Sequence, residues 1–213
     1  IETGLIKIKQ NLEEAKEIKI DPSNSFKLKC LVMDYHSVSD WYANGRNYIF
    51  NWKKNLNFYK VIFSLAKSNK EIFFLIKSKN YLWVKMDFFK DIVNDLKSLE
   101  NVKILTDTND WTPSNCIKNT DFGVVLMTSL ADEMIASGKP VIIYEPDDFP
   151  SCYLDYGSDF ISKDLEDLNY KVGIIKSNLK SYNEKINLIR EKFYKKFDSN
   201  FFYEQIQKLT FNL

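Results

Sequence analysis

The hydrophobic and polar positions of this 213-residue chain alternate between short apolar runs and longer stretches with helical spacing. The apolar runs are short, unbroken and rich in Val, Ile and Phe, as are parallel strands that are buried on both faces. This order predicts an α/β fold, a Rossmann-like parallel sheet with helices on both faces. The expected strands are 26–33, 71–76, 102–105, 122–127 and 141–144, with strand-like 159–161 and 165–168 as the closing edge.

Apolar residues at intervals of three and four predict helices between these strands. The expected helices are 49–68, 83–99, 113–118, 129–137, 181–194 and 200–209. Residues 11–19 also have a charged helical pattern, and we interpret residues 1–25 as a linker that contains this helix. Because a chain of this length can bury one substantial core, we expect residues 26–213 to form one domain that ends in C-terminal helices.

The stretch 119–150 places a strand, a short helix and a second strand in close succession. Ser129 and Asp132 have the spacing of a capping box, which predicts where the helix begins. Gly138 follows the last helical turn, where a left-handed residue ends many helices. A βαβ unit of this kind brings the helix N-terminus to the carboxyl edge of the sheet, where its free N–H groups favour phosphate.

The side chains of this stretch follow a specific order: a hydroxyl pair at the strand end, an acid four residues after the second hydroxyl, and Gly-Lys-Pro before the next strand. The residues are Thr128, Ser129, Glu133, Gly138, Lys139 and Pro140. This order resembles the donor-binding half of two-Rossmann (GT-B) glycosyltransferases, and among them bacterial capsule and teichoic-acid polymerases, whose pattern is roughly D-x-S-S-x-x-x-(D/E)-x-x-x-x-G-K-P. The chain departs from the pattern at the aspartate, where it has Leu126.

The resemblance implies that Thr128 and Ser129 contact the donor phosphates and that Glu133 binds the ribose hydroxyls. The residues by themselves leave a second interpretation open. In it, Thr128 and Ser129 only cap a helix, and Glu133 is a surface acid that the helix dipole favours.

Other loops at the expected carboxyl edge carry further candidates. His36 and Arg46 follow the first strand, Lys77 follows the second, and Trp111 follows the third. In the resembled proteins a basic residue after the first strand holds the donor diphosphate, which suits the bidentate guanidinium of Arg46. Lys77 has two interpretations, as a phosphate contact or as a solvated lysine. Trp111 also has two, because its ring could stack on the nucleotide base or anchor the loop by packing. His36 is a weak candidate for the catalytic base, against the alternative of an ordinary surface residue.

The acidic loop 145–157 contains the adjacent pair Asp147 and Asp148, a pattern that can hold a metal ion. The resembled superfamily usually works without a bound metal, because basic side chains and a helix dipole neutralise the leaving diphosphate. We therefore expect no metal cofactor, and expect these acids to contact sugar or ribose or to be solvated.

Composition narrows the class of partner. The 30 basic residues nearly balance 29 acidic residues, so no overall field draws the chain to nucleic acid. Three widely spaced cysteines argue against a disulfide framework and against a Cys-rich zinc site. No apolar run reaches the length of a membrane span, so we expect a cytoplasmic protein. The lysine face of the C-terminal helices either rests on the inner face of a membrane as a peripheral contact or is solvated.

Together these features predict the donor-binding domain of a glycosyltransferase that builds a bacterial surface polysaccharide of the capsule, lipopolysaccharide or teichoic-acid type. We expect a UDP- or CDP-linked sugar as the donor and a glycan or lipid-linked acceptor held by a missing N-terminal domain. The chain alone is then expected to be inactive. Two alternatives remain: a UDP-sugar 2-epimerase-like enzyme, which normally has a glycine pair after the serine, and a non-catalytic α/β nucleotide-binding module.

Overall fold

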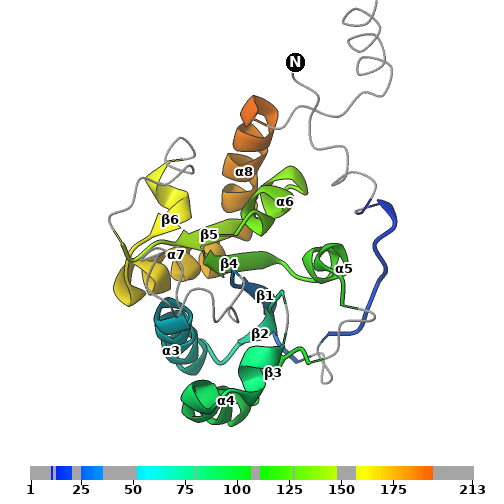
Figure 1. Ribbon diagram of the computed structural model, residues 1–213. Helices are drawn as coiled ribbons and strands as arrows, with labels where there is room; N and C mark the ends of the chain where they lie inside the picture. Colours follow the sequence, from blue (N-terminus) through cyan, green and yellow to red (C-terminus); the bar gives the residue numbers. More distant parts are fainter. Residues whose placement is uncertain are drawn as a thin grey trace, which may run out of the picture.

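The computed structural model describes residues 11, 13–20, 25–35, 52–79, 81–106, 111–126, 128–147 and 157–193. Within these residues a six-stranded sheet has the order β3-β2-β1-β4-β5-β6, and all neighbouring strands run parallel (Figure 1). The strands are β1 Leu28–Met33, β2 Ile72–Lys77, β3 Val102–Ile104, β4 Phe122–Leu126, β5 Val141–Tyr144 and β6 Ile161–Ser162. The predicted fold class is confirmed.

The strand order reverses between β1 and β4, which lie side by side with Leu31 opposite Gly123. The chain moves outward from β1 through β2 to β3 and then returns to β4. Because parallel crossovers are right-handed, the two directions of travel put their helices on opposite faces of the sheet. Open α/β sheets bind their ligands beyond the strand ends at such a reversal, and we call this region, beyond the carboxyl ends of β1 and β4, the crevice.

Helices cover both faces of the sheet, and their mutual packing defines two groups (Figure 1). On one face α3 (Trp52–Ser68) packs against α4 (Lys90–Lys97) and α7 (Leu165–Ser177). On the other, α6 (Leu130–Ala136) packs against α5 (Pro113–Lys118) and α8 (Leu179–Phe193). Three short 3-10 turns, η1 (Leu82–Lys85), η2 (Asp87–Phe89) and η4 (Ser158–Phe160), complete the described elements.

The core lies between the sheet and these two helix groups. β2, β4 and β5 are buried along their whole lengths, which explains their unbroken apolar sequences. A Cβ atom added at Gly123 would lie 2.3 Å from the sulfur of Met134, so this glycine allows α6 to pack closely on β4. Each fully buried Leu, Ile or Phe side chain stabilises the fold by about 1.5–3 kcal/mol relative to leaving it in water.

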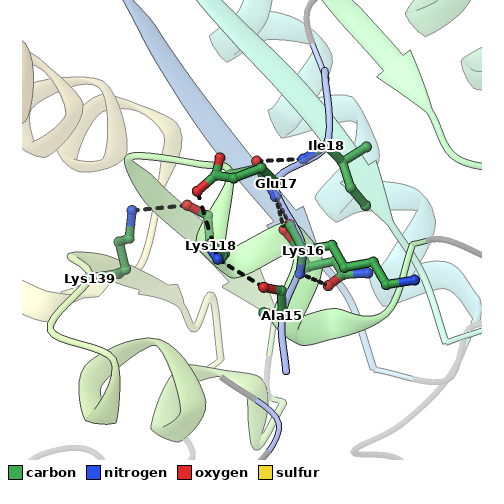
Figure 2. A network of polar contacts seen from close by, with 8 residues as sticks. Ala15, Lys16, Glu17, Ile18, Lys118 and Lys139 are labelled. Carbon is green, nitrogen blue, oxygen red and sulfur yellow. Dashed lines mark hydrogen bonds and ion pairs between the residues drawn. The ribbon is translucent and has the colours of Figure 1, made fainter. Parts of the chain in front are cut away.

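The helix predicted over 11–19 is wrong for residues 15–19, which with residue 20 form an extended strap along α5 (Figure 2). The side chain of Asn119 donates to the carbonyl of Lys16 at 2.8 Å and accepts from the N–H of Ile18 at 2.9 Å. Lys118 Nζ donates to the carbonyl of Ala15 at 2.8 Å. These contacts replace the backbone hydrogen bonds of a helix, and burial of Ile20 in the core holds the strap in place.

Two further predicted elements are wrong, one in part and one entirely. The helix expected over 83–99 is broken into η1, η2 and α4, because the Trp83 side chain is fully buried and its ring N–H bonds to Ser78 Oγ at 2.8 Å. The strand expected at 165–168 is the first turn of α7, where the side chain of Asp164 accepts from the N–H of Asp167 at 2.8 Å. The expected helix 200–209 lies outside the described residues.

Candidate functional site

Thr128 and Ser129 lie where β4 ends, at the crevice between β1 and β4. The Thr128 hydroxyl accepts from the N–H of Leu130 at 3.4 Å, and the Thr128 carbonyl accepts from the N–H of Ala131 at 3.1 Å. Among the described residues the exposed Ser129 side chain makes no capping hydrogen bond, so the predicted capping box is wrong. Thr128 closes the turn one residue earlier, which leaves the Ser129 hydroxyl at the carboxyl edge.

Glu133 lies in the first turn of α6, four residues after Ser129, and is half-buried. Its position on the α6 side of the crevice is the one that the sequence predicted. α6 has only seven residues, so the electrostatic effect of its N-terminus is small. Any preference of this region for an anion would therefore depend mainly on side chains.

The Gly-Lys part of the motif lies at the opposite edge of the sheet. Gly138 has a φ of +71°, and the N–H groups of Gly138 and Lys139 bond to the carbonyls of Ile135 and Met134, each at 2.9 Å, as in a Schellman cap. Lys139 Nζ donates to the carbonyl of Thr120 at 2.6 Å. Burial lowers the pKa of Lys139, and the charges of Asp121 and Glu17 oppose that effect. These two residues therefore shape the fold far from the crevice.

Lys77 ends β2 and is buried near the carboxyl edge. Its Nζ donates to the carbonyl of Ser78 at 2.7 Å. Burial lowers the pKa of Lys77, and the nearby Cys116 and Asp34 partly counteract this. Only β1 separates β2 from β4, so the strand ends that carry Lys77 and Thr128 are about 10 Å apart.

A chain of buried hydrogen bonds underlies this edge, and sequence reasoning missed it. The ring N–H of Trp83 donates to Ser78 Oγ at 2.8 Å, Ser78 Oγ lies 3.0 Å from the Tyr59 hydroxyl, and that hydroxyl donates to Asp34 Oδ2 at 2.7 Å. Tyr59 and Trp83 also stack, with ring centroids 4.1 Å apart. The available signal was Asp34 itself, an acid that directly follows a buried strand.

The structure places Trp111 away from the crevice. Trp111 packs against the core, and Lys103 Nζ of β3 lies 4.9 Å from its ring centroid. Three strand spacings, about 14 Å, separate β3 from β4. This arrangement fits the packing alternative for Trp111, and its contact with a base stays a prediction.

Several predicted contacts lie outside the described residues, namely His36, Arg46 and Asp148. Asp147 is described and forms an ion pair with Lys54 of α3. Among the described residues, no group of three or more His, Cys, Asp or Glu side chains is arranged to hold a metal ion. No helix in the described part of the chain is both long and apolar enough to cross a membrane.

Neither a protein-family model nor a curated protein sequence matches the chain. Solved structures share its fold. The Staphylococcus aureus MnaA–UDP structure has a TM-score of 0.61 at 14% identity and covers 96% of this chain and 52% of its own. The wall teichoic acid polymerase TagF has a TM-score of 0.53 at 14% identity, with 95% and 44% covered. The C-terminal domain of the Francisella tularensis group 1 glycosyl transferase LpcC has a TM-score of 0.55 at 12% identity, with 87% and 98% covered.

The chain has the fold of one half of a GT-B protein. It spans about half the length of the full-size proteins, for example 46% of a putative UDP-N-acetylglucosamine 2-epimerase from Listeria monocytogenes. By contrast, it covers nearly all of the single LpcC domain. Glycosyltransferases and 2-epimerases both have this GT-B half, so the fold alone does not separate the two activities.

Proposed function

We propose that this chain is the nucleotide-sugar-binding half of a GT-B enzyme, with the diphosphate of the ligand at the crevice between β1 and β4. One observation carries the proposal: the strand reversal brings Lys77, Thr128 and Ser129 to the same carboxyl edge. An ammonium group and two hydroxyl groups can all donate hydrogen bonds to phosphate oxygens. The proposed site thus offers a diphosphate one positive charge and two hydroxyl donors within a nearly neutral chain.

Each side chain has a distinct role in this proposal. Lys77 and Arg46 neutralise the diphosphate, Thr128 and Ser129 hold its oxygens, and Glu133 accepts hydrogen bonds from the ribose hydroxyls. In a transfer reaction the negative charge grows on the departing nucleoside diphosphate, so donors that are already in place stabilise the transition state. The proposal requires no metal ion.

Among enzymes with this fold, we propose a glycosyltransferase of bacterial surface polysaccharide synthesis. The hydroxyl pair, the acid and Gly-Lys-Pro follow the capsule and teichoic-acid pattern, whereas Leu130 and Ala131 occupy the positions of the epimerase glycine pair. The acceptor and the catalytic base would belong to a second half of the enzyme, because GT-B reactions take place between two domains. This chain alone should therefore bind the donor without transferring its sugar.

Thermal unfolding with added nucleotides tests the proposal. UDP or CDP should raise the melting temperature, and AMP, which lacks a diphosphate, should not. A ligand at a hundredfold excess over its Kd stabilises the folded state by about 2.7 kcal/mol. For a chain of this size that corresponds to a rise of about 5–11 °C. The absence of a shift with every nucleoside diphosphate would refute the donor-domain proposal and favour a different binding module.

Glu133→Gln tests the ribose contact. It keeps the shape of the side chain and one acceptor but removes the charge, so affinity for the best nucleotide should fall about ten- to a hundredfold. Asp132→Asn is the matched control, since Asp132 is the other acid in the first turn of α6. Calorimetric titration should show a loss for Glu133→Gln alone. Equal small losses in both variants would indicate only a dipole effect.

A further inference from the structure

One buried amide near the crevice has no hydrogen bonds within the part of the chain that the structure describes. Asn55 lies in the first turn of α3, its exposed fraction is 0%, and neither Oδ1 nor Nδ2 has a partner there. Three other buried asparagines, Asn69, Asn101 and Asn115, all use their amides. Because buried polar groups are almost always paired, an unpaired amide requires an explanation.

The neighbours of Asn55 on α3 locate it relative to the sheet. Phe58 and Tyr59, three and four residues later, share its buried face. The Phe58 ring lies 5.9 Å from the ring of Tyr144 at the end of β5, and the Tyr59 hydroxyl reaches Asp34 just beyond β1. β4 lies between these two strands. Asn55 is therefore above the end of β4, one helical turn, about 5 Å, farther out than Tyr59.

The two helices at the crevice approach it from opposite faces of the sheet. α6, which carries Glu133, lies on one face, and α3, which carries Asn55, lies on the other. α3 has 17 residues and no acid of its own in its first turn, although Asp147 forms an ion pair with Lys54 there. A ligand with its ribose at Glu133 and its diphosphate at the crevice would extend its remaining group toward Asn55.

We propose that Asn55 binds hydroxyl groups of the sugar in the nucleotide sugar, an inference that rests on the proposed function. An asparagine amide has a donor on Nδ2 and an acceptor on Oδ1. Diphosphate oxygens only accept hydrogen bonds, so they would satisfy Nδ2 and leave Oδ1 unpaired. Sugar hydroxyls both donate and accept, so they can satisfy both atoms. The Asn55 amide thus contacts the sugar, which UDP lacks.

The test replaces Asn55 with Leu, which has a similar size and no polar atoms. The melting temperature of the free protein should rise by about 2–4 °C, because an unpaired buried amide is removed. Affinity for UDP-N-acetylglucosamine or UDP-glucose should fall about tenfold or more, while affinity for UDP changes less than about twofold. Asn55→Ala provides a second binding measurement in case Leu does not fit the site.

Asn69→Leu is the matched control at the other end of α3. The amide of Asn69 donates to the carbonyl of Leu65 at 2.8 Å, so this change should lower the melting temperature and leave both affinities unchanged. A lower melting temperature in Asn55→Leu together with unchanged sugar-nucleotide affinity in Asn55→Ala would show that the amide serves only the fold, and the inference would be wrong. Equal losses of UDP and UDP-sugar affinity would also overturn it, as would a wild type that binds both sugar nucleotides no better than UDP. If the wild type binds none of the three ligands, the proposed function itself fails, and the inference fails with it.

Discussion

The two edges of the sheet differ in how they use their buried polar groups. At the amino-terminal edge, Asn101 Nδ2 lies 3.0 Å from the carbonyl of Ala66 and 2.9 Å from that of Ile72, and Lys139 binds the carbonyl of Thr120. At the carboxyl edge, neither amide atom of Asn55 has a partner among the described residues.

The comparison separates groups whose hydrogen bonds stabilise the fold from the Asn55 amide, which is unpaired within the described part of the chain and which we propose binds a ligand. An unpaired buried polar group costs folding free energy, and such a cost is often the price of function. The strap in Figure 2 belongs to the first kind, since its backbone groups are bonded by Asn119 and Lys118. Substitutions at the amino-terminal edge should therefore change stability alone, and those at the carboxyl edge should change binding.

The largest effect is expected for Asn101→Leu. Its amide lies within hydrogen-bond distance of three carbonyls, those of Ala66, Asn69 and Ile72, which would be left buried without this donor. The free energy of unfolding should fall by about 2–4 kcal/mol, with nucleotide affinity unchanged. Urea unfolding measures the loss, and Asn55→Leu should change stability in the opposite direction. If both Asn101→Leu and Asn55→Leu lower the free energy of unfolding, the proposed difference between the two edges is wrong.

The second prediction concerns pH and Cys116, which interacts electrostatically with Lys77. Burial raises the pKa of the Cys116 thiol from 9.0 to about 12. The folded state keeps the proton that the unfolded chain loses, so the contribution is complete below pH 9 and is lost as pH rises toward 12. The loss is about 1.4 kcal/mol per pH unit, or about 2 kcal/mol at pH 10.5.

Cys116→Ala isolates this effect, since the variant lacks the thiol but keeps the other titrating groups. Its free energy of unfolding should be below that of the wild type at pH 8, because a buried side chain is shortened. The difference should shrink by about 2 kcal/mol by pH 10.5. Denaturant curves at both pH values measure it, and a constant difference would mean that the thiol titrates normally in the fold.

A smaller effect is expected for Asn119→Ala in the strap. The variant loses the hydrogen bonds to Lys16 and Ile18, so the free energy of unfolding should fall by about 1–2 kcal/mol. Asn119→Asp keeps the acceptor for the Ile18 N–H and should lose about half as much. Thermal unfolding of the two variants gives this graded comparison. Equal stability of the wild type and Asn119→Ala would show that the strap contributes little.

The smallest effect is expected for Lys118→Met. Its ion pair with Glu17, 3.7 Å long, is exposed, and such pairs contribute little in water. Loss of the bond to the Ala15 carbonyl should lower the free energy of unfolding by less than about 1 kcal/mol. The difference should be nearly the same at low and high salt, because a neutral carbonyl is the main acceptor. A strong salt dependence would instead assign the effect to the ion pair.

The sequence predicted best those elements whose patterns depend on local structure and burial. β5 has the predicted bounds, α5 begins at Pro113 and ends at Lys118 as expected, and Gly138 has the left-handed conformation that its position required. A strand buried on both faces must be apolar throughout, and few residues adopt a positive φ. These constraints act on each short stretch separately and can therefore be read from the chain.

The predicted helices are wrong in stretches where contacts with distant residues outweigh the local preference for a helix. The 83–99 stretch has helical spacing, yet Trp83 is buried under Tyr59 and the first part becomes two 3-10 turns. The strap at residues 15–20 has a charged helical pattern, but Asn119 binds its backbone from about 100 positions away. α7 differs from these two stretches, because the signal for its start is local: Asp164 caps the helix by accepting from the N–H of Asp167.

The sequence by itself determined an α/β chain with a hydroxyl pair and an acid at a strand end, because those features depend on residue order alone. Only the tertiary structure decided which side chains share the crevice. It placed Lys77 two strands from Thr128, assigned Lys139 to the opposite edge and left the Asn55 amide unpaired within the described residues. These relations depend on strand order and helix packing, which join residues that are far apart in the sequence.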